Sequence, residues 1–372
     1  MIRAEARAPT ANVAAAAPHN APPISLSVCI CTHERPGYLR SCLESLRAQS
    51  IGLSNFEIVV VDSASSAATT AQLRGMVAEL PNAQLVRVDE AGASLARNAG
   101  INACQGSHVA FLDDDAVAMP DWLECMLQAL AEAGPNAGVV GGRVLPRWEA
   151  PLPPWWPQEL LGVLSIIEFE GRGEYRTDAL PSKLEPYSVN MVVNRAAVLA
   201  VGGFEAQLGR VGTRLLSDED VQLAWKLQDA GYSARYDSRV VVHHQIQAPR
   251  LRPEWLLDRL YWQGASTVLT RRLLHHGQEH NRLELLRRLA VEVLFAPVAL
   301  LPENSTRLLS LRWRHAYASG FTRMALAGME RKRSVALRGL RRLLHQGGNA
   351  MQAGLEQGSA EAQPTPKPGA QA

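Results

Sequence analysis

The stretch His108-Val109-Ala110-Phe111-Leu112-Asp113-Asp114-Asp115 decides the fold class of this chain. A short apolar run with Gly106 before it and acids after it is typical of a buried strand. The three carboxylates then stand at the carboxyl end of that strand, where open α/β sheets bind their ligands. Because such closely spaced like charges repel, the triplet requires a cation or strong hydrogen-bond donors, and oxygen ligands suit Mg²⁺ or Mn²⁺. Considered alone, a solvated acidic turn that ends the strand is an equally good interpretation.

Apolar strands alternate with amphipathic helices around this stretch. One helix is predicted to open at Pro36, a favoured first helical position, and another at Pro120. Near-continuous apolar strands separated by helices predict a parallel sheet that is covered on both faces. The other predicted strands are residues 27–31, 57–61 and 84–88, and the other predicted helices are residues 67–79 and about 93–106.

The carboxyl ends of parallel strands share one edge of the sheet. Here that edge would bring together the loop 32–35, Asp62 and the acidic triplet 113–115. An acid after the second strand accepts hydrogen bonds from a ribose or a base, and a short loop that leads into a helix N-terminus suits a nucleotide. No G-x-G-x-x-G or G-x-x-x-x-G-K-[ST] sequence follows any strand, which excludes a Rossmann dinucleotide fingerprint and a P-loop.

The 372 residues are enough for one large α/β domain with an appendage, or for two domains. Charge is distributed unevenly: residues 1–249 carry 19 Lys and Arg against 27 Asp and Glu, whereas residues 250–345 carry 18 against 7. A basic block of this kind either faces an anionic partner, such as a membrane surface or nucleic acid, or forms a helical layer with a solvated arginine face.

Neither end of the chain predicts a packed structure. Residues 1–25 are rich in Ala and Pro without the apolar core of a signal peptide, and residues 346–372 are rich in Gly, Gln and Pro, so we expect both to be disordered. The most apolar later stretch, residues 289–301, is shorter than the roughly 20 residues that span a bilayer. The five cysteines lack zinc spacing and are expected to be buried thiols in a reducing compartment. We therefore expect a cytoplasmic protein, soluble or peripheral at the inner face of the cell membrane.

Several segments, in order along the chain, resemble the motifs of family 2 glycosyltransferases. The triplet within residues 110–115 (AFLDDD) is similar to their "FLDDD" signature. The resemblance spans roughly residues 26–265, and its ordered motifs are jointly specific, although D-x-D alone is weak. The other matching segments are residues 27–36 (SVCICTHERP), 60–65 (VVDSAS), 92–100 (GASLARNAG), 201–205 (VGGFE), 217–220 (SDED), 230–232 (AGY) and 242–244 (VHH).

This resemblance implies an α/β GT-A fold, with a Rossmann-like, mostly parallel central sheet, helices on both faces and a C-terminal helical extension. It implies a glycosyltransferase domain at residues 26–249, whose nucleotide-binding half is 26–135 and whose acceptor half is 136–249, followed by a basic amphipathic extension at 250–345. The implied reaction is inverting transfer of a sugar from a nucleotide diphosphate, UDP by default, to an acceptor hydroxyl in polysaccharide, glycolipid or glycoconjugate synthesis. Mn²⁺ or Mg²⁺ would neutralise the charge that develops on the leaving diphosphate.

The resemblance also implies how the sheet edge holds the donor. Asp115 and Asp113 would bind the metal, Asp113 would also contact the ribose or donor sugar, and the part of Asp114 in donor binding stays open. His244 is similar to a histidine that completes the metal or diphosphate site, with His243 as the competing candidate; imidazole suits Mn²⁺ better than Mg²⁺. The remaining donor-binding residues are Thr32, Arg35, Asp62 at the base or ribose, and Arg97 near the diphosphate, unless Arg97 forms a helix-surface salt bridge.

A transferase also needs a base that takes the proton of the acceptor hydroxyl. Glu219 and Asp220 precede an apolar helical pattern, so they stand at a predicted helix start, where the helix dipole favours ionised carboxylates. The similarity to the family's "ED" segment makes Asp220 the implied base and Glu219 the residue that orients the acceptor. Taken alone, both would be ordinary first-turn acids of a helix capped by Asp218. Gln222 and Ser188 depart from the family pattern, which weakens inference about the acceptor.

Aromatic and basic segments suggest the acceptor's surroundings. The tryptophans of the Pro-rich loop 147–157 either stack on an acceptor sugar, face a membrane interface or pack on the domain. Amphipathic helices beyond residue 250 carry arginines that would bind anionic headgroups and bring a lipid-linked acceptor close. The expected partners are a nucleotide-sugar donor and a carbohydrate or lipid-linked acceptor, with peripheral membrane contact through these helices and no nucleic acid.

Two other function classes share parts of this pattern. Residues 111–117 (FLDDDAV) also satisfy the D-x-D-x-[TV] motif of haloacid-dehalogenase-like phosphatases, but those enzymes carry the motif on their first strand. A sugar-nucleotide pyrophosphorylase would need a Gly-rich N-terminal phosphate loop, which is missing. A non-catalytic nucleotide-sugar-binding protein would not need Asp113, Asp115 and Asp220 together.

Overall fold

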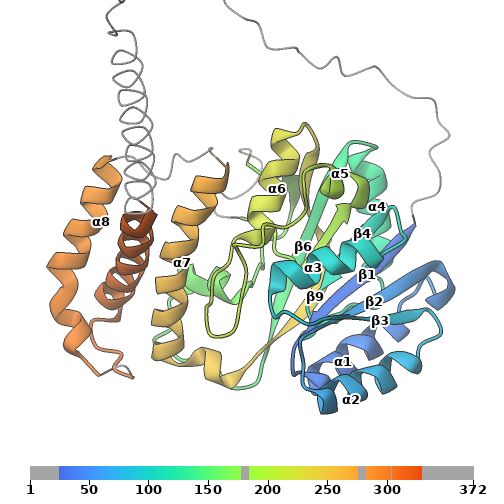
Figure 1. The fold of residues 1–372 in the computed structure, drawn as a ribbon, viewed down its shortest axis with the longest axis horizontal. Coiled ribbons are helices and arrows are strands. Elements are labelled where there is room, and N and C mark those ends of the chain that lie inside the picture. The colour runs from blue at the N-terminus through green and yellow to red at the C-terminus, as the bar shows by residue number, and fades with distance from the viewer. Residues whose placement is uncertain (1–24, 177–183, 275–281, 303, 329–372) are drawn as a thin grey trace, which may run out of the picture.

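A mixed sheet with helices around it forms the centre of the protein (Figure 1). The structure is a computed structural model that describes residues 25–176, 184–274, 282–302 and 304–328. Within these residues the sheet has nine strands in the order β3-β2-β1-β4-β8-β6-β9-β5, with β7 paired to β9. The segments expected to be disordered, residues 1–25 and 346–372, lie outside the described residues except for Ser25.

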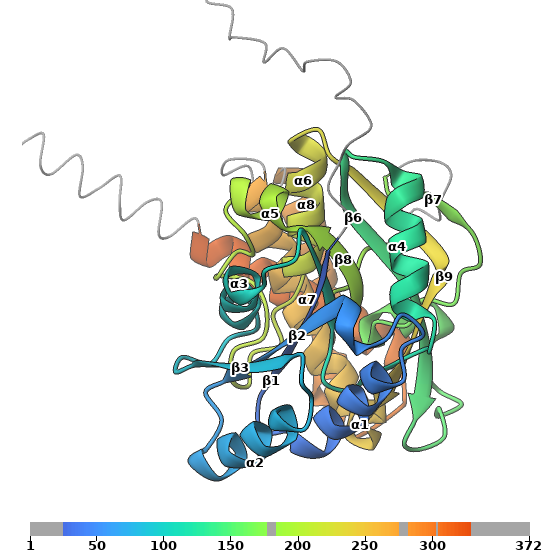
Figure 2. The same ribbon diagram turned by 90° about the vertical axis from the view of Figure 1, so that its right-hand side faces the viewer.

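The first four strands are parallel and follow the predicted alternation with helices. Their apolar side chains are buried: every residue of Val28–Ile30 in β1 is at most 1% exposed. Figure 2 shows α3 on one side of β1, β2 and β3, and α1 with α2 on the other. The predicted α/β fold is therefore confirmed. These elements are β1 (Leu26–Thr32), α1 (Pro36–Arg47), β2 (Phe56–Ser63), α2 (Ala67–Ala78), β3 (Ala83–Val88), α3 (Ala93–Ala103), β4 (His108–Leu112) and α4 (Trp122–Ala133), which begins two residues after Pro120.

The second half of the sheet is mixed, so the parallel pairing of the first four strands does not continue through it. Strand β8 runs antiparallel to both β4 and β6, while β6 and β9 are parallel. Strand direction here depends on pairing between segments far apart in sequence, which a local pattern of apolar residues does not encode. The elements are β5 (Ala116–Ala118), β6 (Ala137–Trp148), β7 (Arg172–Glu174), β8 (Asn190–Asn194), α5 (Arg195–Ala200), α6 (Glu219–Asp229) and β9 (Ser233–Ile246).

Strand β9 carries His244 within it. The short strand β5 starts directly after the acidic triplet and pairs with β9, so that Ala116 lies opposite His244. The backbone N–H of Gln245 also donates to the carbonyl of Asp115, at 2.7 Å. This pairing, rather than closeness in sequence, brings His244 to the triplet.

Helices of the C-terminal region pack beside the sheet, as predicted. Helix α7 packs against α6 and against the helix at residues 309–328, which forms a separate apolar cluster with α7 around Val268 and Phe321. A Cβ on Gly264 would collide with the backbone of Tyr317, so a glycine is needed where the two helices cross. Among the described residues, no helix is both long enough and apolar enough to cross a membrane. The remaining elements are α7 (Pro253–Leu274), α8 (Arg282–Phe295), η1 (Leu53–Asn55), η2 (Gln158–Leu164), η3 (Ala248–Leu251) and η4 (Ala296–Leu300).

The tryptophan-rich segment packs on the domain. Trp148 ends β6, and Trp156 is 4% exposed within a second apolar core that includes Ile246 and Leu256. Trp155 is partly buried against the same core. Of the three interpretations of this segment, packing on the domain is thus confirmed for Trp156.

Candidate active site

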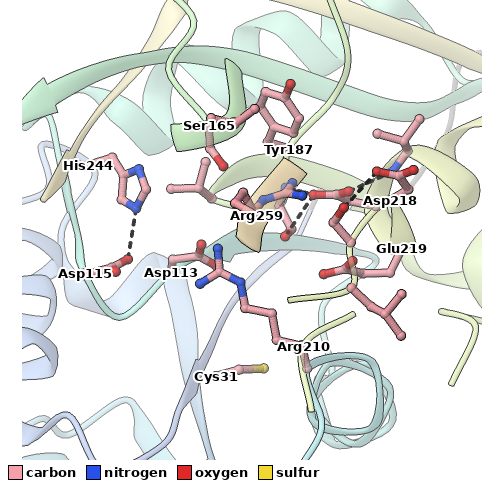
Figure 3. Close-up of a pocket in the computed structure, with 18 of the residues that line it drawn as sticks. Cys31, Asp113, Asp115, Ser165, Tyr187, Arg210, Asp218, Glu219, His244 and Arg259 are labelled. Atoms are coloured by element: carbon pink, nitrogen blue, oxygen red, sulfur yellow. Dashed lines mark hydrogen bonds and ion pairs between the residues drawn. The ribbon is translucent and has the colours of Figure 1, made fainter. Parts of the chain in front are cut away.

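A cavity of about 600 Å³ opens where the carboxyl ends of β1 and β4 face the start of α6. Asp113 and Asp115 lie on one side of it and Glu219 on the other (Figure 3). Helix α7 and the helix at 309–328 complete the wall. The predicted site residues that line the cavity are Thr32, Arg35, Arg97, Asp113, Asp114, Asp115, Glu219, Asp220 and His244.

The carboxylate of Asp115 is buried and surrounded by donors. Its Oδ2 accepts hydrogen bonds from Arg35 Nη1 at 3.0 Å, Gln247 Nε2 at 2.8 Å and Arg250 Nη2 at 3.1 Å. Burial alone would raise the pKa of Asp115, but His244, Arg250 and Arg35 hold this pKa well below its usual value. Asp115 is therefore ionised, and at 2% exposure it is not part of a solvated turn.

Asp114 has the opposite electrostatic environment. Thr32 Oγ1 donates to its Oδ2 at 2.7 Å, and Arg35 Nη1 donates to its Oδ1 at 3.3 Å. Burial and the neighbouring charge of Asp115 raise the pKa of Asp114 to about 7. Asp113 differs again, because its side chain is 39% exposed and faces Arg97 Nη2 at 3.6 Å. The three acids thus present one fixed anion, one carboxyl that titrates near neutrality and one carboxylate at the cavity surface.

His244 lies next to the free oxygen of Asp115. Its Nε2 is 3.3 Å from Asp115 Oδ1, and its Nδ1 is 3.0 Å from the carbonyl oxygen of Leu164. Because a carbonyl only accepts, Nδ1 carries a proton and donates it to Leu164. A backbone carbonyl that fixes the tautomer in this way is the usual second partner of a metal-binding histidine.

Arg97 joins the two sides of the cavity. Its Nη1 donates to Glu219 Oε1 at 2.7 Å while its Nη2 faces Asp113. The side chain is 10% exposed and stacks on Phe204, with the guanidinium carbon 5.6 Å from the ring centroid. The nearby acids hold the pKa of Arg97 above its usual value in spite of burial. A helix-surface salt bridge is therefore the wrong interpretation of this residue.

The two acids that begin α6 are buried. Asp220 accepts hydrogen bonds from the backbone N–H groups of Ser188 and Val221, both at 2.9 Å. Burial and the charge of Glu219 raise the pKa of Asp220 to about 7. Asp218 does not cap the helix through its side chain, because its backbone is left-handed, with φ of 73°. The interpretation of Asp218 as the cap is thus wrong, and its carboxylate binds Gln263 Nε2 at 2.8 Å instead.

Asp62 is the one predicted site residue that does not line the cavity. It is fully buried at the end of β2, where its oxygens accept from the backbone N–H of Ser65 at 3.0 Å, Thr70 Oγ1 at 2.6 Å and Arg87 Nη1 at 2.8 Å. These donors fold the loop after β2 around the carboxylate. Ser63 lines the cavity from the same strand end.

Several cavity residues were not predicted from sequence. Arg250, which lines the cavity, and the buried Gln247 behind it both bind Asp115 from the segment after β9; the sequence placed Arg250 only within a basic block. No local motif marks these residues, since strand pairing and helix packing bring them to the cavity. The other unpredicted lining residues include Glu185, Tyr187, Arg210, Arg259, Gln263 and Tyr317.

Comparison with known proteins agrees with this geometry. The model described as Glycosyl transferase family 2 matches residues 27–197. The match shows that residues 27–197 are similar to family 2 glycosyltransferases. It begins at β1 and includes the acidic triplet, so it covers the donor side of the cavity, while α6 and the C-terminal helices lie beyond it. With the described sheet and helices, it supports a GT-A fold.

Curated relatives match a longer part of the chain. A glucosyl-dolichyl phosphate glucuronosyltransferase of Haloferax volcanii is 28% identical over 247 residues, which are 65% of this chain and 76% of that protein. The succinoglycan biosynthesis protein ExoM of Rhizobium meliloti is 26% identical over 258 residues, 65% of this chain and 74% of that protein. A solved structure of the mannosyltransferase PcManGT from Pyrobaculum calidifontis in complex with GDP-Man and Mn²⁺ is 18% identical, with a TM-score of 0.49, and the likeness covers 89% of this chain and 84% of that chain.

Proposed function

We propose that this protein is an inverting glycosyltransferase that moves a sugar from a nucleotide diphosphate to an acceptor hydroxyl, with assistance from Mn²⁺ or Mg²⁺. One observation carries the proposal: a single cavity holds an ionised Asp115 on one wall and Asp220, whose pKa is about 7, on the other. Inverting transfer needs these two kinds of group, one for the leaving diphosphate and one for the attacking hydroxyl, on opposite sides of the sugar.

Asp115 and His244 on the first wall are the proposed ligands of a divalent cation, and the described residues hold no cluster of three or more His, Cys, Asp or Glu groups that would form a complete site without substrate. Asp115 Oδ1 and His244 Nε2 are 3.3 Å apart, which is a suitable spacing for two ligands of one ion. Such ions commonly take one or two carboxylates and complete their coordination with substrate phosphate oxygens. In the proposal Asp113 contacts the donor sugar or ribose, Arg97 neutralises the diphosphate, and Thr32 with Arg35 holds the loop against the nucleotide. A bound metal would supply charge stabilisation for the leaving diphosphate.

Asp220 is the proposed base. A carboxyl whose pKa is about 7 is ionised in a useful fraction at neutral pH and is still basic enough to accept a proton. It takes the proton of the acceptor hydroxyl as the acceptor oxygen bonds to the anomeric carbon. The bond from that carbon to the diphosphate oxygen breaks on the other face, and its electron pair leaves with the diphosphate. Glu219, held by Arg97, would orient the acceptor.

The phosphatase alternative has little support in this cavity. Asp113 follows the fourth strand rather than the first, and no lysine is among the described residues that line the cavity. A haloacid-dehalogenase-like enzyme needs its acidic motif on the first strand and a lysine in the site. We therefore retain it only as an outcome of the test.

A panel of UDP- and GDP-sugars with Mn²⁺ or Mg²⁺ tests the proposal, read by thermal shift and by slow donor hydrolysis. We expect metal-dependent stabilisation by one nucleotide class, and its loss in Asp115→Ala. The exposed Asp121, just before α4, gives the matched control Asp121→Ala, which should behave as the wild type. Equal, metal-independent binding of all nucleotides, or phosphatase turnover that Asp113→Asn abolishes, would contradict the proposal.

The acceptor is proposed to be a carbohydrate carried on a lipid, reached from an anionic membrane surface. Helix α8 has no buried residues among those described, and Leu283, Leu286, Val293 and Leu294 on it are 62–75% exposed. Their spacing places them along one helical stripe, and exposed arginines flank it. Apolar side chains beside arginines suit the interface of a bilayer that contains anionic lipids. The name of the Haloferax volcanii relative, which includes a dolichyl phosphate, agrees with such an acceptor.

Liposome flotation of the full chain tests the membrane contact. We expect binding that requires anionic lipid and that falls in the double variant Leu286→Asp, Leu294→Asp. The matched control is Leu199→Asp, because Leu199 is an exposed leucine on α5. Binding that is equal for neutral and anionic vesicles, or a concentration-dependent dimer that the same double variant abolishes, would show that this stripe has another partner.

A further inference from the structure

Two arginines of the cavity have no part in the donor and base chemistry proposed above. Arg259 on α7 is 8% exposed, and its Nη1 has no hydrogen-bond partner among the described residues. A buried charged N–H without an acceptor is unfavourable, so native structures rarely keep one unless a ligand or water satisfies it. Arg259 also lines the cavity directly. The unpaired donor is therefore available to a molecule that enters there.

Arg210 supplies a second positive charge at the same place. It lies in the loop before α6, and Figure 3 shows its side chain extending into the cavity, with Arg259 beyond it near Tyr187 and Asp218. Burial lowers the pKa of Arg259, and the charge of Arg210 lowers it further. An anion that contacts both guanidinium groups would offset the effect of the Arg210 charge on Arg259.

Arg259 lies apart from the proposed donor site, whereas Arg210 extends toward Asp113 (Figure 3) and its charge also lowers the pKa of Arg250, which binds Asp115. Donor phosphates are assigned to Asp115, His244 and Arg97, at the sheet edge. Arg259 belongs instead to the wall formed by α7, where Leu216, Leu260 and Tyr317 provide an apolar and aromatic surface. That wall is on the side of Glu219 and Asp220, from which the acceptor hydroxyl would approach.

We propose that Arg259 and Arg210 form a phosphate-binding subsite for the acceptor, which holds a phosphate or diphosphate group of the acceptor while its hydroxyl faces Asp220. The inference rests on the proposed function and specifies its acceptor as a phosphorylated molecule. Two cations favour a phosphate over a carboxylate, because a phosphate carries more than one negative charge and offers oxygens to both guanidinium groups. The apolar wall beside them would receive an uncharged part of the same acceptor.

Calorimetric titration of inorganic pyrophosphate tests this subsite in the full-length protein. The protein is first saturated with Mn²⁺ and the nucleoside diphosphate that it prefers, so that the donor's own phosphate positions are filled. We expect pyrophosphate to bind this complex, and to bind about 10- to 100-fold more weakly in Arg259→Gln, since a hydrogen-bonded charge is removed. Arg259→Lys, which keeps the charge, should retain part of the affinity. The matched control is Arg74→Gln, an exposed arginine of α2 outside the cavity.

Nucleotide affinity, measured on the same variants, separates the possible outcomes. Unchanged nucleotide binding in Arg259→Gln, together with weakened pyrophosphate binding, would support an acceptor subsite and would show that the variant is folded. A loss of nucleotide affinity in Arg259→Gln would assign the arginine to the donor diphosphate and overturn the subsite. Pyrophosphate binding that is absent, or equal in wild type and Arg259→Gln, would also overturn it. A wild-type protein that binds no nucleotide would instead contradict the proposed glycosyl transfer itself.

Discussion

Replacing Asp220 by asparagine should abolish transfer and also make the protein more stable above neutral pH. Burial and Glu219 raise the pKa of Asp220 from 3.8 to about 7. Since the folded state then binds this proton more tightly than the unfolded state, the contribution of Asp220 to stability is complete below pH 3.8 and is lost as the pH rises to about 7. Asparagine does not titrate, so Asp220→Asn escapes this loss.

The size of the effect follows from the pKa. Each pKa unit corresponds to 1.36 kcal/mol, so the free energy of unfolding of Asp220→Asn, relative to wild type, should increase by about 3 kcal/mol between pH 5 and pH 8. The amide also replaces one acceptor oxygen by a donor that faces the N–H of Ser188 or Val221, which costs roughly 1–3 kcal/mol. That penalty is independent of pH and shifts both measurements equally.

Urea denaturation at pH 5 and pH 8 measures the difference, and a transfer assay on the same samples measures activity. We expect transfer to fall about 10²- to 10⁴-fold, which is the usual contribution of a general base, while metal-dependent nucleotide binding is kept. Asp229→Asn is the matched control, because Asp229 is at the other end of α6 and its side chain is 63% exposed. A stability difference that does not change with pH would refute the reasoning, since Asp220 would then be ionised as an ordinary carboxyl. Retained transfer would show that another group is the base.

Three further predictions concern the same site and its helical wall. The value of kcat/KM should rise with pH through about 7 as Asp220 loses its proton; a flat profile between pH 5 and pH 8 would contradict this. Asp115→Asn should remove most Mn²⁺-dependent thermal stabilisation by the donor but leave the fold intact by circular dichroism, because Asp115 supplies the free oxygen beside His244. Gly264→Ala should reduce the free energy of unfolding by about 1–3 kcal/mol in urea, since its methyl group would press on the backbone of the facing helix. Gly37→Ala, with no atom within 4 Å of the added carbon, should show no such loss.

The sequence predicted the part of the fold that depends on local pattern. The apolar runs that became β1 to β4 are bounded by turn residues and separated by amphipathic helices, so their type and order could be read directly. The antiparallel insertion of β8 between β4 and β6 could not, because its three apolar residues, Met191, Val192 and Val193, are compatible with either strand direction. The direction of β8 is set by its pairing with β4 and β6, which are distant from it in sequence.

The site residues also differ in whether the sequence alone could predict their positions. Asp113–Asp115 were predicted from their place at a strand end, and Glu219 with Asp220 from the resemblance to the family's "ED" segment; the structure brings both groups to one cavity. Asp62 was also predicted from its place at a strand end, but it binds its own loop and Arg87 instead. A motif therefore indicates which strand end carries an acid. Whether that acid faces the cavity depends on the donors that the following loop supplies.

Asp114 and Asp115 show why the chemistry of a site needs the folded structure. They are neighbours in sequence and both buried, yet the pKa of Asp114 is raised to about 7 while that of Asp115 is held well below its usual value. The difference comes from His244 and Arg250, which β9 and the turn after it bring to Asp115 from more than 120 residues away. If those two partners were removed, both carboxyls would share one buried environment and repel each other, and the triplet would lose its fixed anion. The metal ligand proposed at this site is therefore selected among three identical side chains by the pairing of β5 with β9.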